Sequence, residues 1–265
     1  MEYGIGVRGS RAAGGPGPAG AAPDADADAD ETRSNVAAYR PRDFELFRAE
    51  SVIFGRFLRP GMLVLDLGTG NGRVASRLAL RGIGILACDL NLDALAEFQA
   101  ARASAGNGER VEIFGGDARA LPLRDGSVDA VVFAYNGLDM IGSMSGRVDA
   151  LAEIHRVLRP GGVFVASSHN PIGTILSPRA TRSRQLWRFR LRHLRTGAVL
   201  HPMFDDVDGA RIHQASPGTF IRQVRRVTGL EPVGVWSTRS GLRGRAAATL
   251  FSAWPTYVFR KPAAG

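Results

Sequence analysis

The chain has 265 residues, of which 45% are hydrophobic and 22% charged, so it can bury a full core as a soluble globular protein. No uninterrupted apolar run approaches the roughly 18 residues of a membrane-spanning helix, and no stretch has the pattern of a secretory signal. The single Cys88 excludes an internal disulfide framework and is expected to be a small core residue. We therefore expect a cytoplasmic protein without membrane association. The net charge of +9 is compatible with nucleic acid, an acidic substrate or an arginine-rich proteome, and does not choose among them.

Composition divides the chain into a tail and one domain. Residues 1–34 are rich in Gly, Pro and Ala and carry too few large apolar side chains to offset the entropy cost of ordering, so we predict a disordered tail. The rest, 35–265, is expected to be a single domain. Within it, residues 170–216 form an insertion far longer than an ordinary loop, which predicts a cap over the substrate. Arginines interleaved with apolar residues over 179–195 are typical of a solvated helix face, an anion-binding lid or a nucleic-acid contact.

Strands and helices alternate from residue 44 onward, which predicts a parallel sheet with helices on both faces. Apolar periodicity and turn residues place strands at 62–67, 83–88, 111–114, 128–134, 163–167, 231–237 and 255–260. Helices are predicted at 44–58, 74–80, 146–158 and 217–228, with a further one that begins at Asn91. We expect Leu92, Leu95 and Phe98 to share one buried face, and Val148, Leu151, Ile154 and Leu158 another. The last two strands are expected to form an antiparallel edge.

A glycine-rich turn follows the first strand of this pattern. The run Val64-Leu65-Asp66-Leu67-Gly68-Thr69-Gly70-Asn71-Gly72-Arg73 joins a buried strand to the start of a helix, where open parallel sheets hold their ligands. Its glycines are spaced one position tighter than in the dinucleotide fingerprint. Asp66 just before them would repel a pyrophosphate and attract a cation or an ammonium group. The turn therefore predicts a nucleotide-type cofactor without phosphates.

Several further segments extend this pattern along the chain. Asp89 comes 23 residues after Asp66, Gly116-Asp117-Ala118 ends the third strand, and the runs 121–129 and 156–162 precede the fourth and fifth strands. Together with the glycine turn, they resemble the class I S-adenosylmethionine-dependent methyltransferases over residues 36–168 and 217–260. The resemblance implies an α/β fold with a Rossmann-like, doubly wound, seven-stranded sheet, mostly parallel with an antiparallel edge strand. It also implies S-adenosyl-L-methionine as cofactor.

The resemblance assigns the cofactor contacts. Asp89 is expected to accept hydrogen bonds from both ribose hydroxyls, although it has a simpler reading as a helix cap. Leu90 is expected against the adenine or in the core, Asp117 is expected to accept from the adenine amino group, and the Ala118 N–H to donate to the ring. Asp66 orients the turn or reaches the cofactor's ammonium. The full expected set is Asp66, Gly68, Thr69, Gly70, Gly72, Asp89, Leu90, Asp117, Ala118 and Tyr135.

The acceptor side is predicted less directly. Methyl transfer is a displacement at carbon that depends on in-line positioning, and a hydroxyl or protonated amine also needs a base. We assign this role to His169, which follows strand five; a histidine bonded only to loop backbone is the alternative. Asp139 is the second candidate and His213 the third, while Tyr135 either contacts the sulfonium with its ring or packs. No metal site is expected, because the run 205–209 lacks the full calcium spacing and predicts a turn.

The sequence thus predicts an S-adenosylmethionine-dependent methyltransferase that moves a methyl group to oxygen or nitrogen of a small organic acceptor. One alternative is an RNA or DNA methyltransferase, favoured by the net charge. It is disfavoured because Tyr135-Asn136 reverses the order found in enzymes that methylate base amino groups, and no proline follows. Another alternative is a non-catalytic regulatory protein that binds S-adenosylmethionine. The oligomeric state is left open.

Overall fold

The computed structural model describes residues 45–105, 110–176, 191, 203–205 and 211–263. The predicted tail over 1–34 and most of the insertion over 170–216, including nearly all of the arginine-rich run and residues 206–209, lie outside these ranges. No helix among the described residues is long and apolar enough to cross a lipid bilayer.

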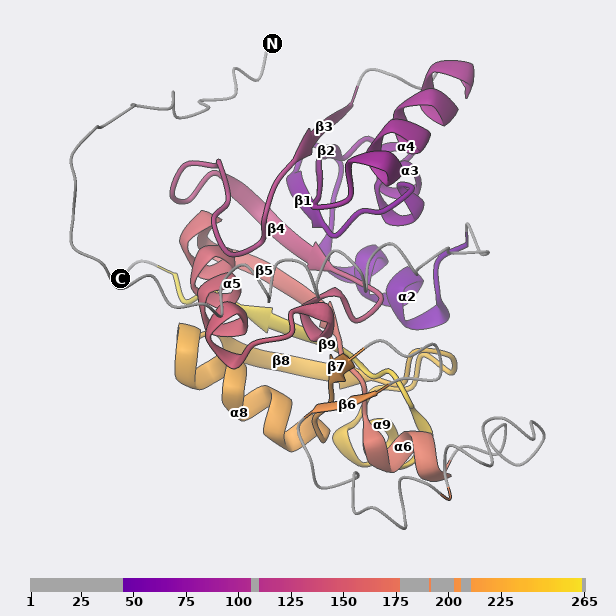
Figure 1. Ribbon diagram of the computed structural model, residues 1–265, viewed down its shortest axis with the longest axis vertical. Helices are drawn as coiled ribbons and strands as arrows, with labels where there is room; N and C mark the ends of the chain where they lie inside the picture. The colour runs from indigo at the N-terminus through magenta and orange to yellow at the C-terminus, as the bar shows by residue number, and fades with distance from the viewer. Residues whose placement is uncertain (1–44, 106–109, 177–190, 192–202, 206–210, 264–265) are drawn as a thin grey trace.

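A mixed seven-stranded sheet forms the centre of the molecule (Figure 1). Neighbouring strands are parallel except where β9 pairs antiparallel with both β5 and β8, so the predicted fold class is confirmed. In sheet order the strands are β3 (Val111–Gly115), β2 (Gly84–Asp89), β1 (Leu63–Leu67), β4 (Val128–Phe133), β5 (Leu158–Ser167), β9 (Thr256–Arg260) and β8 (Glu231–Trp236).

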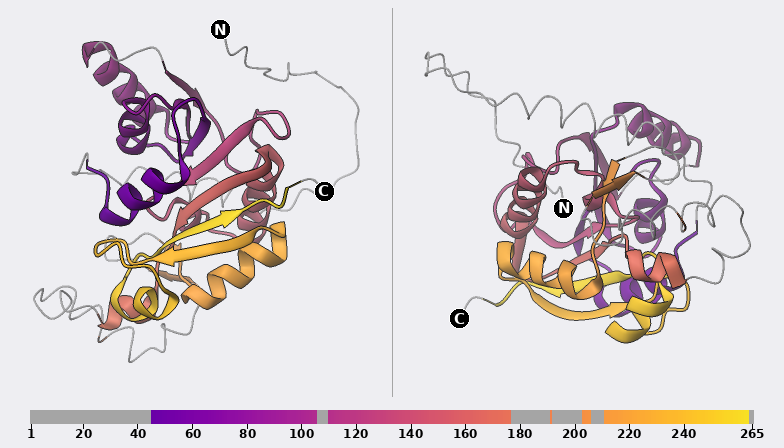
Figure 2. Two further views of the ribbon diagram at one scale, coloured as in Figure 1. Left: turned by 180° about the vertical axis from the view of Figure 1, so that it is seen from behind. Right: turned by 60° about the horizontal axis from the view of Figure 1, so that its bottom comes forward.

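Helices cover both faces of this sheet (Figures 1 and 2). One face carries α2 (Arg48–Phe57), α3 (Arg73–Ala79) and α4 (Leu92–Ala105). The other carries α5 (Met144–Val157), α8 (Pro217–Thr228) and α9 (Arg245–Phe251). The remaining elements are a short 3-10 helix η1 (Gly137–Met140), α6 (Pro171–Leu176) and the hairpin of β6 (Met203–Asp205) and β7 (Arg211–His213). Strand side chains alternate between the two cores, as expected for a sheet buried on both sides.

Two of the predicted apolar faces are partly wrong. Leu92 is 67% exposed, because it lies in the first turn of α4, while Leu95 and Phe98 are buried as predicted. Val148 is 43% exposed. The buried stripe of α5 runs one position earlier and includes the charged Arg147, which the periodicity did not predict as an inward residue.

The ends of several elements also differ from the predictions. Leu158 begins β5 and does not end the preceding helix, so β5 is five residues longer than predicted. The first described helix begins at Arg48, not at 44. Cys88 is fully buried in β2, and burial raises the pKa of its thiol, as expected for a core residue.

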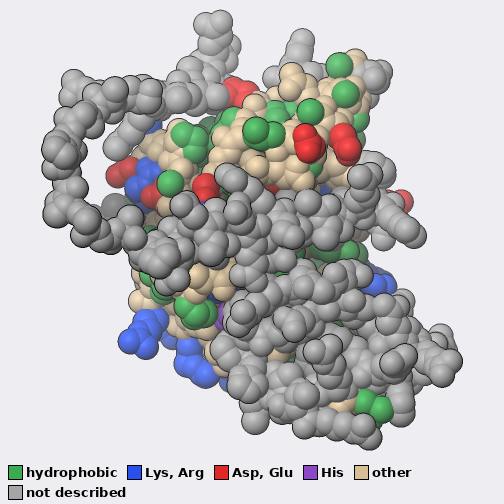
Figure 3. Space-filling model, in the orientation of Figure 1, with side chains coloured by type: hydrophobic (Ala, Val, Ile, Leu, Met, Phe, Trp, Pro, Cys, Tyr) green, Lys and Arg blue, Asp and Glu red, His purple; other side chains and the backbone are tan. Residues whose placement is uncertain are grey.

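Exposed arginines gather on α8, at the sheet edge formed by β8. Arg222, Arg225 and Arg226 are exposed on this helix. Blue side chains are seen at the lower left of the space-filling view, where Figure 1 shows α8 in the same orientation (Figure 3). This surface is separated from β1 and β2 by several strands of the sheet. Its charge therefore belongs to the outer side of the fold and not to the glycine turn.

Arg156 holds the segment before β4 in place through hydrogen bonds to its backbone carbonyls. Arg156, near the end of α5, donates to the Leu123 carbonyl at 2.7 Å and the Leu121 carbonyl at 3.0 Å. It also pairs with Glu153 and Asp125. The run 121–125 has no regular secondary structure, so these bonds replace a ladder that would otherwise satisfy its carbonyls.

We predict that Arg156→Ala lowers the free energy of unfolding by about 2 kcal/mol, because two partly buried carbonyls lose charged donors. Thermal unfolding followed by circular dichroism should show a midpoint lower by several degrees. The matched control is Arg226→Ala on the exposed face of α8, expected within about 0.5 kcal/mol of the parent. Equal midpoints for the two variants would contradict the assigned role of Arg156.

Candidate functional site

The carboxyl ends of β1, β2, β4 and β5 meet at one edge of the sheet, and the glycine turn lies there. Gly68, Gly70 and Gly72 have φ of 66°, 55° and 80°, in the left-handed region that favours glycine. A Cβ on Gly72 would lie 2.0 Å from the Phe98 ring, so this glycine allows α4 to pack against the turn. Nothing lies within 4 Å of a Cβ placed on Gly70, which borders open space. Gly72 thus has a packing role, whereas Gly68 and Gly70 line a cavity.

Asp66 stabilises the glycine turn through two hydrogen bonds. Its Oδ2 accepts hydrogen bonds from the Thr69 hydroxyl at 2.7 Å and from the Ala75 N–H at 3.0 Å. Burial raises the pKa of Asp66 to about 7, although these two donors act in the opposite direction. This carboxyl therefore changes charge near neutral pH while holding the glycine turn to the start of α3.

Asp89 joins the ends of β1 and β2. Its Oδ2 accepts from the Gly70 N–H at 2.7 Å, and its Oδ1 accepts from the Asn91 N–H at 2.9 Å. Asn91 itself begins α4 by accepting from the Asp93 and Ala94 N–H groups. The cap therefore belongs to Asn91, while Asp89 faces the cavity, and burial raises its pKa.

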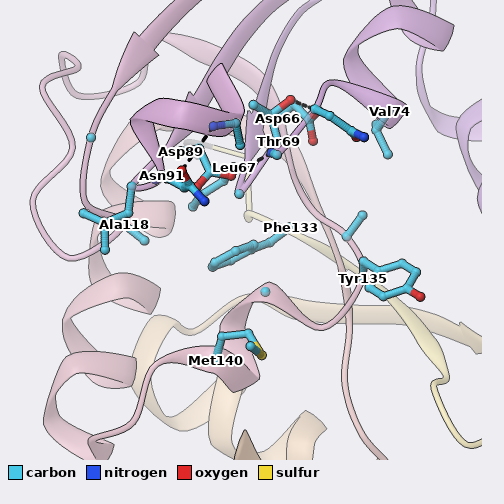
Figure 4. Close-up of a pocket in the computed structure, with 18 of the residues that line it drawn as sticks. Asp66, Leu67, Thr69, Val74, Asp89, Asn91, Ala118, Phe133, Tyr135 and Met140 are labelled. Carbon is cyan, nitrogen blue, oxygen red and sulfur yellow. Dashed lines mark hydrogen bonds between the residues drawn. The ribbon is translucent and has the colours of Figure 1, made fainter. Parts of the chain in front are cut away.

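These residues surround a cavity of about 360 Å³ (Figure 4). Asp66, Thr69 and Asp89 lie along one side, Phe133 and Met140 opposite them, Ala118 at one end and Tyr135 at the other. The volume falls within the range of small-molecule sites. Of the predicted cofactor set, the cavity lining contains Asp66, Gly68, Thr69, Gly70, Asp89, Leu90, Asp117, Ala118 and Tyr135.

Asp117 has an unexpected partner. Both of its carboxylate oxygens accept from Arg119, with the Nη2 to Oδ2 distance at 2.7 Å. The Arg119 N–H also donates to Oδ1 at 2.9 Å. Because Asp117 and Arg119 are only two residues apart, their pairing could have been predicted, but the Gly116-Asp117-Ala118 motif does not indicate it. Any ligand donor that reaches Asp117 has to share the carboxylate with this guanidinium.

The segment after β4 is held in a strained conformation. Tyr135 and Asn136 have φ of 54° and 64°, values that non-glycine residues adopt at a cost. The Asn136 N–H donates to the Ser167 hydroxyl at 2.8 Å, which ties this turn to the end of β5. A Cβ on Gly137 would lie 2.1 Å from the Phe133 ring, so the chain passes closely over that ring. This geometry places Tyr135 at the mouth of the cavity.

An ion pair that the sequence did not predict supports Tyr135. Arg73 donates to both carboxylate oxygens of Glu50, at 2.7 and 2.8 Å, and both side chains are buried. The same guanidinium lies 5.1 Å from the Phe47 ring centre and 5.7 Å from the Tyr135 ring centre. The two rings stack at 5.7 Å. No periodicity links Glu50 to Arg73, because they meet only when α2 packs beside the glycine turn.

Asp139 and His169 come together behind this turn. Asp139 is fully buried, and its Oδ2 accepts from the His169 N–H at 2.6 Å and lies 3.0 Å from His169 Nδ1. Its Oδ1 accepts from the Ser168 hydroxyl at 3.1 Å and lies 3.3 Å from Arg147 Nη1. Burial alone would raise the pKa of Asp139. The hydrogen bond from His169, followed by the nearby His213 and Arg147, holds that pKa well below its usual range.

The ionised Asp139 fixes the state of the His169 ring. An acceptor-only carboxylate beside Nδ1 requires a proton on that nitrogen, which leaves a lone pair on Nε2. The Asn136 side-chain amide nitrogen lies 3.4 Å from Nε2, as a donor would. His169 is about 15% exposed and lies edge-on to Trp254, which in turn lies 6.0 Å from the Tyr135 ring. A proton acceptor and an aromatic surface therefore adjoin the mouth of the cavity.

The comparisons agree with this architecture. The family described as "Methyltransferase domain" matches residues 64–162. The chain is 36% identical over 109 residues to a demethylmenaquinone methyltransferase of Beutenbergia cavernae, covering 41% of each protein. It is 38% identical over 107 residues to a ubiquinone/menaquinone biosynthesis C-methyltransferase of Paracoccus denitrificans, covering 39% of this chain and 41% of that one. The chain thus spans about two fifths of the length of these relatives.

A solved structure extends the likeness in fold. The 1,6-didemethyltoxoflavin-N1-methyltransferase of Burkholderia thailandensis, crystallised with S-adenosylhomocysteine, aligns with a TM-score of 0.61 at 18% identity, over 93% of each chain. At this identity the likeness is one of fold. From the sheet order, the glycine turn and these matches, the chain is similar in fold and in part of its sequence to S-adenosylmethionine-dependent methyltransferases, and its residues 64–162 match a methyltransferase domain.

Proposed function

We propose that this chain transfers a methyl group from S-adenosyl-L-methionine to a small planar acceptor that carries an acidic hydroxyl group. The observation that supports this proposal is the pairing of His169 with the ionised Asp139, at the same sheet edge as the cavity. Tyr135 and Trp254 connect the two places with a continuous aromatic surface, on which a flat acceptor can stack.

The residues of the cavity fit the cofactor. Asp89 offers a carboxylate for the two ribose hydroxyls, Leu90 an apolar side chain for the adenine, and Ala118 a backbone donor for the ring. Asp117 is proposed to accept from the adenine amino group while it stays paired with Arg119. Gly68, Thr69 and Gly70 border the place for the amino acid end, with Asp66 behind them.

The bound cofactor supplies an electrophilic methyl group on a sulfonium. The protein's task is then to align the acceptor and to remove its proton. The Tyr135 ring is proposed to face the sulfonium, a cation-aromatic contact worth about 1 kcal/mol. The Nε2 of His169 is proposed to take the hydroxyl proton, and Asp139 to stabilise the charged imidazole that results.

Such an acceptor can attack the methyl group through either of two atoms. A deprotonated aromatic hydroxyl is nucleophilic at its oxygen and at the ring carbon beside it, so one base serves either reaction. The sequence alone favours oxygen or nitrogen, whereas the relatives of known name include one named as a C-methyltransferase. The matched family region ends at residue 162, before His169 and Trp254. His169 and Trp254 of the proposed acceptor site thus lie outside that family match.

The nucleic-acid alternative has little support in the described residues. The exposed arginines of α8 lie at the sheet edge farthest from β3, and the sheet positions the cavity around β1, β2 and β4. Two results together would favour the small-molecule acceptor: methylation of a hydroxylated aromatic compound at a rate that does not depend on salt, and no methylation of short RNA or DNA. Tight cofactor binding without turnover on any acceptor would favour the regulatory alternative.

The first test concerns the cofactor. We predict that Asp89→Asn weakens S-adenosylhomocysteine binding about 10- to 100-fold, the cost of weakening one or two hydrogen bonds to a charged acceptor. Isothermal titration calorimetry measures this directly. Asp93→Asn, an exposed change in the first turn of α4, is the control and should bind as the parent does. No heat of binding for the folded parent would contradict the proposed function itself.

The second test uses the raised pKa of Asp66. If its carboxylate faces the cofactor's ammonium, S-adenosylhomocysteine affinity should rise as the pH increases through about 7, because the ionised form attracts the cation. Asp66→Asn should give a flat profile between about pH 6 and 8. Methylthioadenosine, which lacks the ammonium, should bind the parent without this dependence. A flat profile for the parent with S-adenosylhomocysteine would leave Asp66 only the role of bracing the turn.

The third test concerns the base. We predict that His169→Gln lowers kcat roughly 10²- to 10⁴-fold on a hydroxylated aromatic acceptor. Cofactor affinity should stay unchanged, because His169 is not among the residues that line the cavity. His155→Gln is the control and should keep full activity, because His155 lies near the end of α5, just before β5 begins, whereas His169 follows the other end of β5. Wild-type rates for His169→Gln at neutral pH would assign proton removal elsewhere.

A further inference from the structure

His213 is buried, and neither of its ring nitrogens has a hydrogen-bond partner among the described residues. It ends β7, the strand of the insertion closest in sequence to α8, and none of its surface is exposed. Its Nδ1 lies 3.7 Å from Asp139 Oδ1, too far for a direct hydrogen bond. An unpaired buried donor is costly, so its presence beside a buried carboxylate calls for a functional reason.

The backbone around His213 already holds the proposed base. Gln214 forms a parallel bridge with His169, and the Ala215 N–H donates to the His169 carbonyl at 2.9 Å. The same short segment thus places the His213 ring beside Asp139 and forms backbone contacts with His169. Both members of the Asp139–His169 pair are contacted from the end of the insertion.

The pKa of His213 lies below its ordinary value, which favours the neutral ring. Burial lowers its pKa, and Arg147 and His169 act in the same direction against the opposing pull of Asp139. The other titratable group in electrostatic contact with Asp139 is Tyr257, whose pKa burial raises well above the usual value. A neutral His213 can carry a proton on one ring nitrogen and act as a hydrogen-bond donor.

We propose that His213 is a positioning residue for the base: its Nδ1–H faces Asp139 Oδ1 and holds the carboxylate in the orientation that keeps the proton of His169 on Nδ1. This proposal rests on the proposed function. A shift of β7 by less than about 1 Å brings Nδ1 within hydrogen-bond distance of Oδ1. The position of β7 is thereby coupled to the tautomer of the base.

The wild-type protein tests this directly by ¹⁵N NMR of the imidazole rings in the full chain. His213 is expected to carry its proton on Nδ1, and so is His169. A spectrum in which His213 carries its proton only on Nε2 overturns the proposal, since Nδ1 could then not donate to Asp139. This readout does not depend on any acceptor, so an absence of methyl transfer would contradict the proposed function alone.

Two variants of equal polarity sharpen the test. In His213→Asn the amide nitrogen can take the place of Nδ1, whereas in His213→Gln it lies nearer the place of Nε2. We expect His213→Asn to keep the His169 tautomer and kcat within about threefold. His213→Gln should mix the tautomers and lower kcat about tenfold or more, with S-adenosylhomocysteine affinity unchanged in both. Identical tautomers and rates for the two folded variants would overturn the proposal; if either fails to fold, the wild-type spectrum decides.

Discussion

The Asp89 carboxylate accepts a hydrogen bond from the Gly70 N–H, and this contact ties the turn after β1 to the end of β2. Asp66 does the same for the N-terminus of α3, through the Ala75 N–H. Asp139 holds the residue after β5 in the same way, by accepting a hydrogen bond from the His169 N–H. In each case a buried carboxylate replaces the backbone partner that a loop lacks. The parallel strands bring these loops to one edge, and the carboxylates then fix their shape.

The three carboxylates differ in the charge that surrounds them. Asp66 and Asp89 receive direct hydrogen bonds from neutral hydroxyl and amide groups, so burial dominates and raises the pKa of each. Asp139 also has Arg147 and two histidines beside it, and its pKa falls. One residue type therefore provides a carboxyl that titrates near neutral pH beside the glycine turn and a permanent anion beside His169.

Local signals in the sequence were enough for the sheet and for most of the cavity. The strands are continuous apolar runs, and the glycine turn has a fixed spacing, so both could be predicted without knowing the fold. The buried Arg147 and the Glu50–Arg73 pair could not, because each depends on a partner brought close only by packing. Charged residues on a helix are predicted to face solvent unless the element that packs against them is known. The α9 helix and the β6–β7 hairpin were missed because both are short and lack periodicity.

The proposed cofactor side and the proposed acceptor side are built from different kinds of contact. The cofactor side depends on neighbouring strand ends and on the glycine turn, which lie within the region shared with the methyltransferase family. The acceptor side joins Tyr135 and Asp139 after β4 to His169 after β5, Trp254 before β9 and His213 at the end of the insertion. These parts are far apart in sequence, and the strained turn at Tyr135 and Asn136 carries the ring that lies both at the cavity and beside Trp254. The strain at that turn is therefore best understood as the cost of placing an aromatic ring where the two sides must meet.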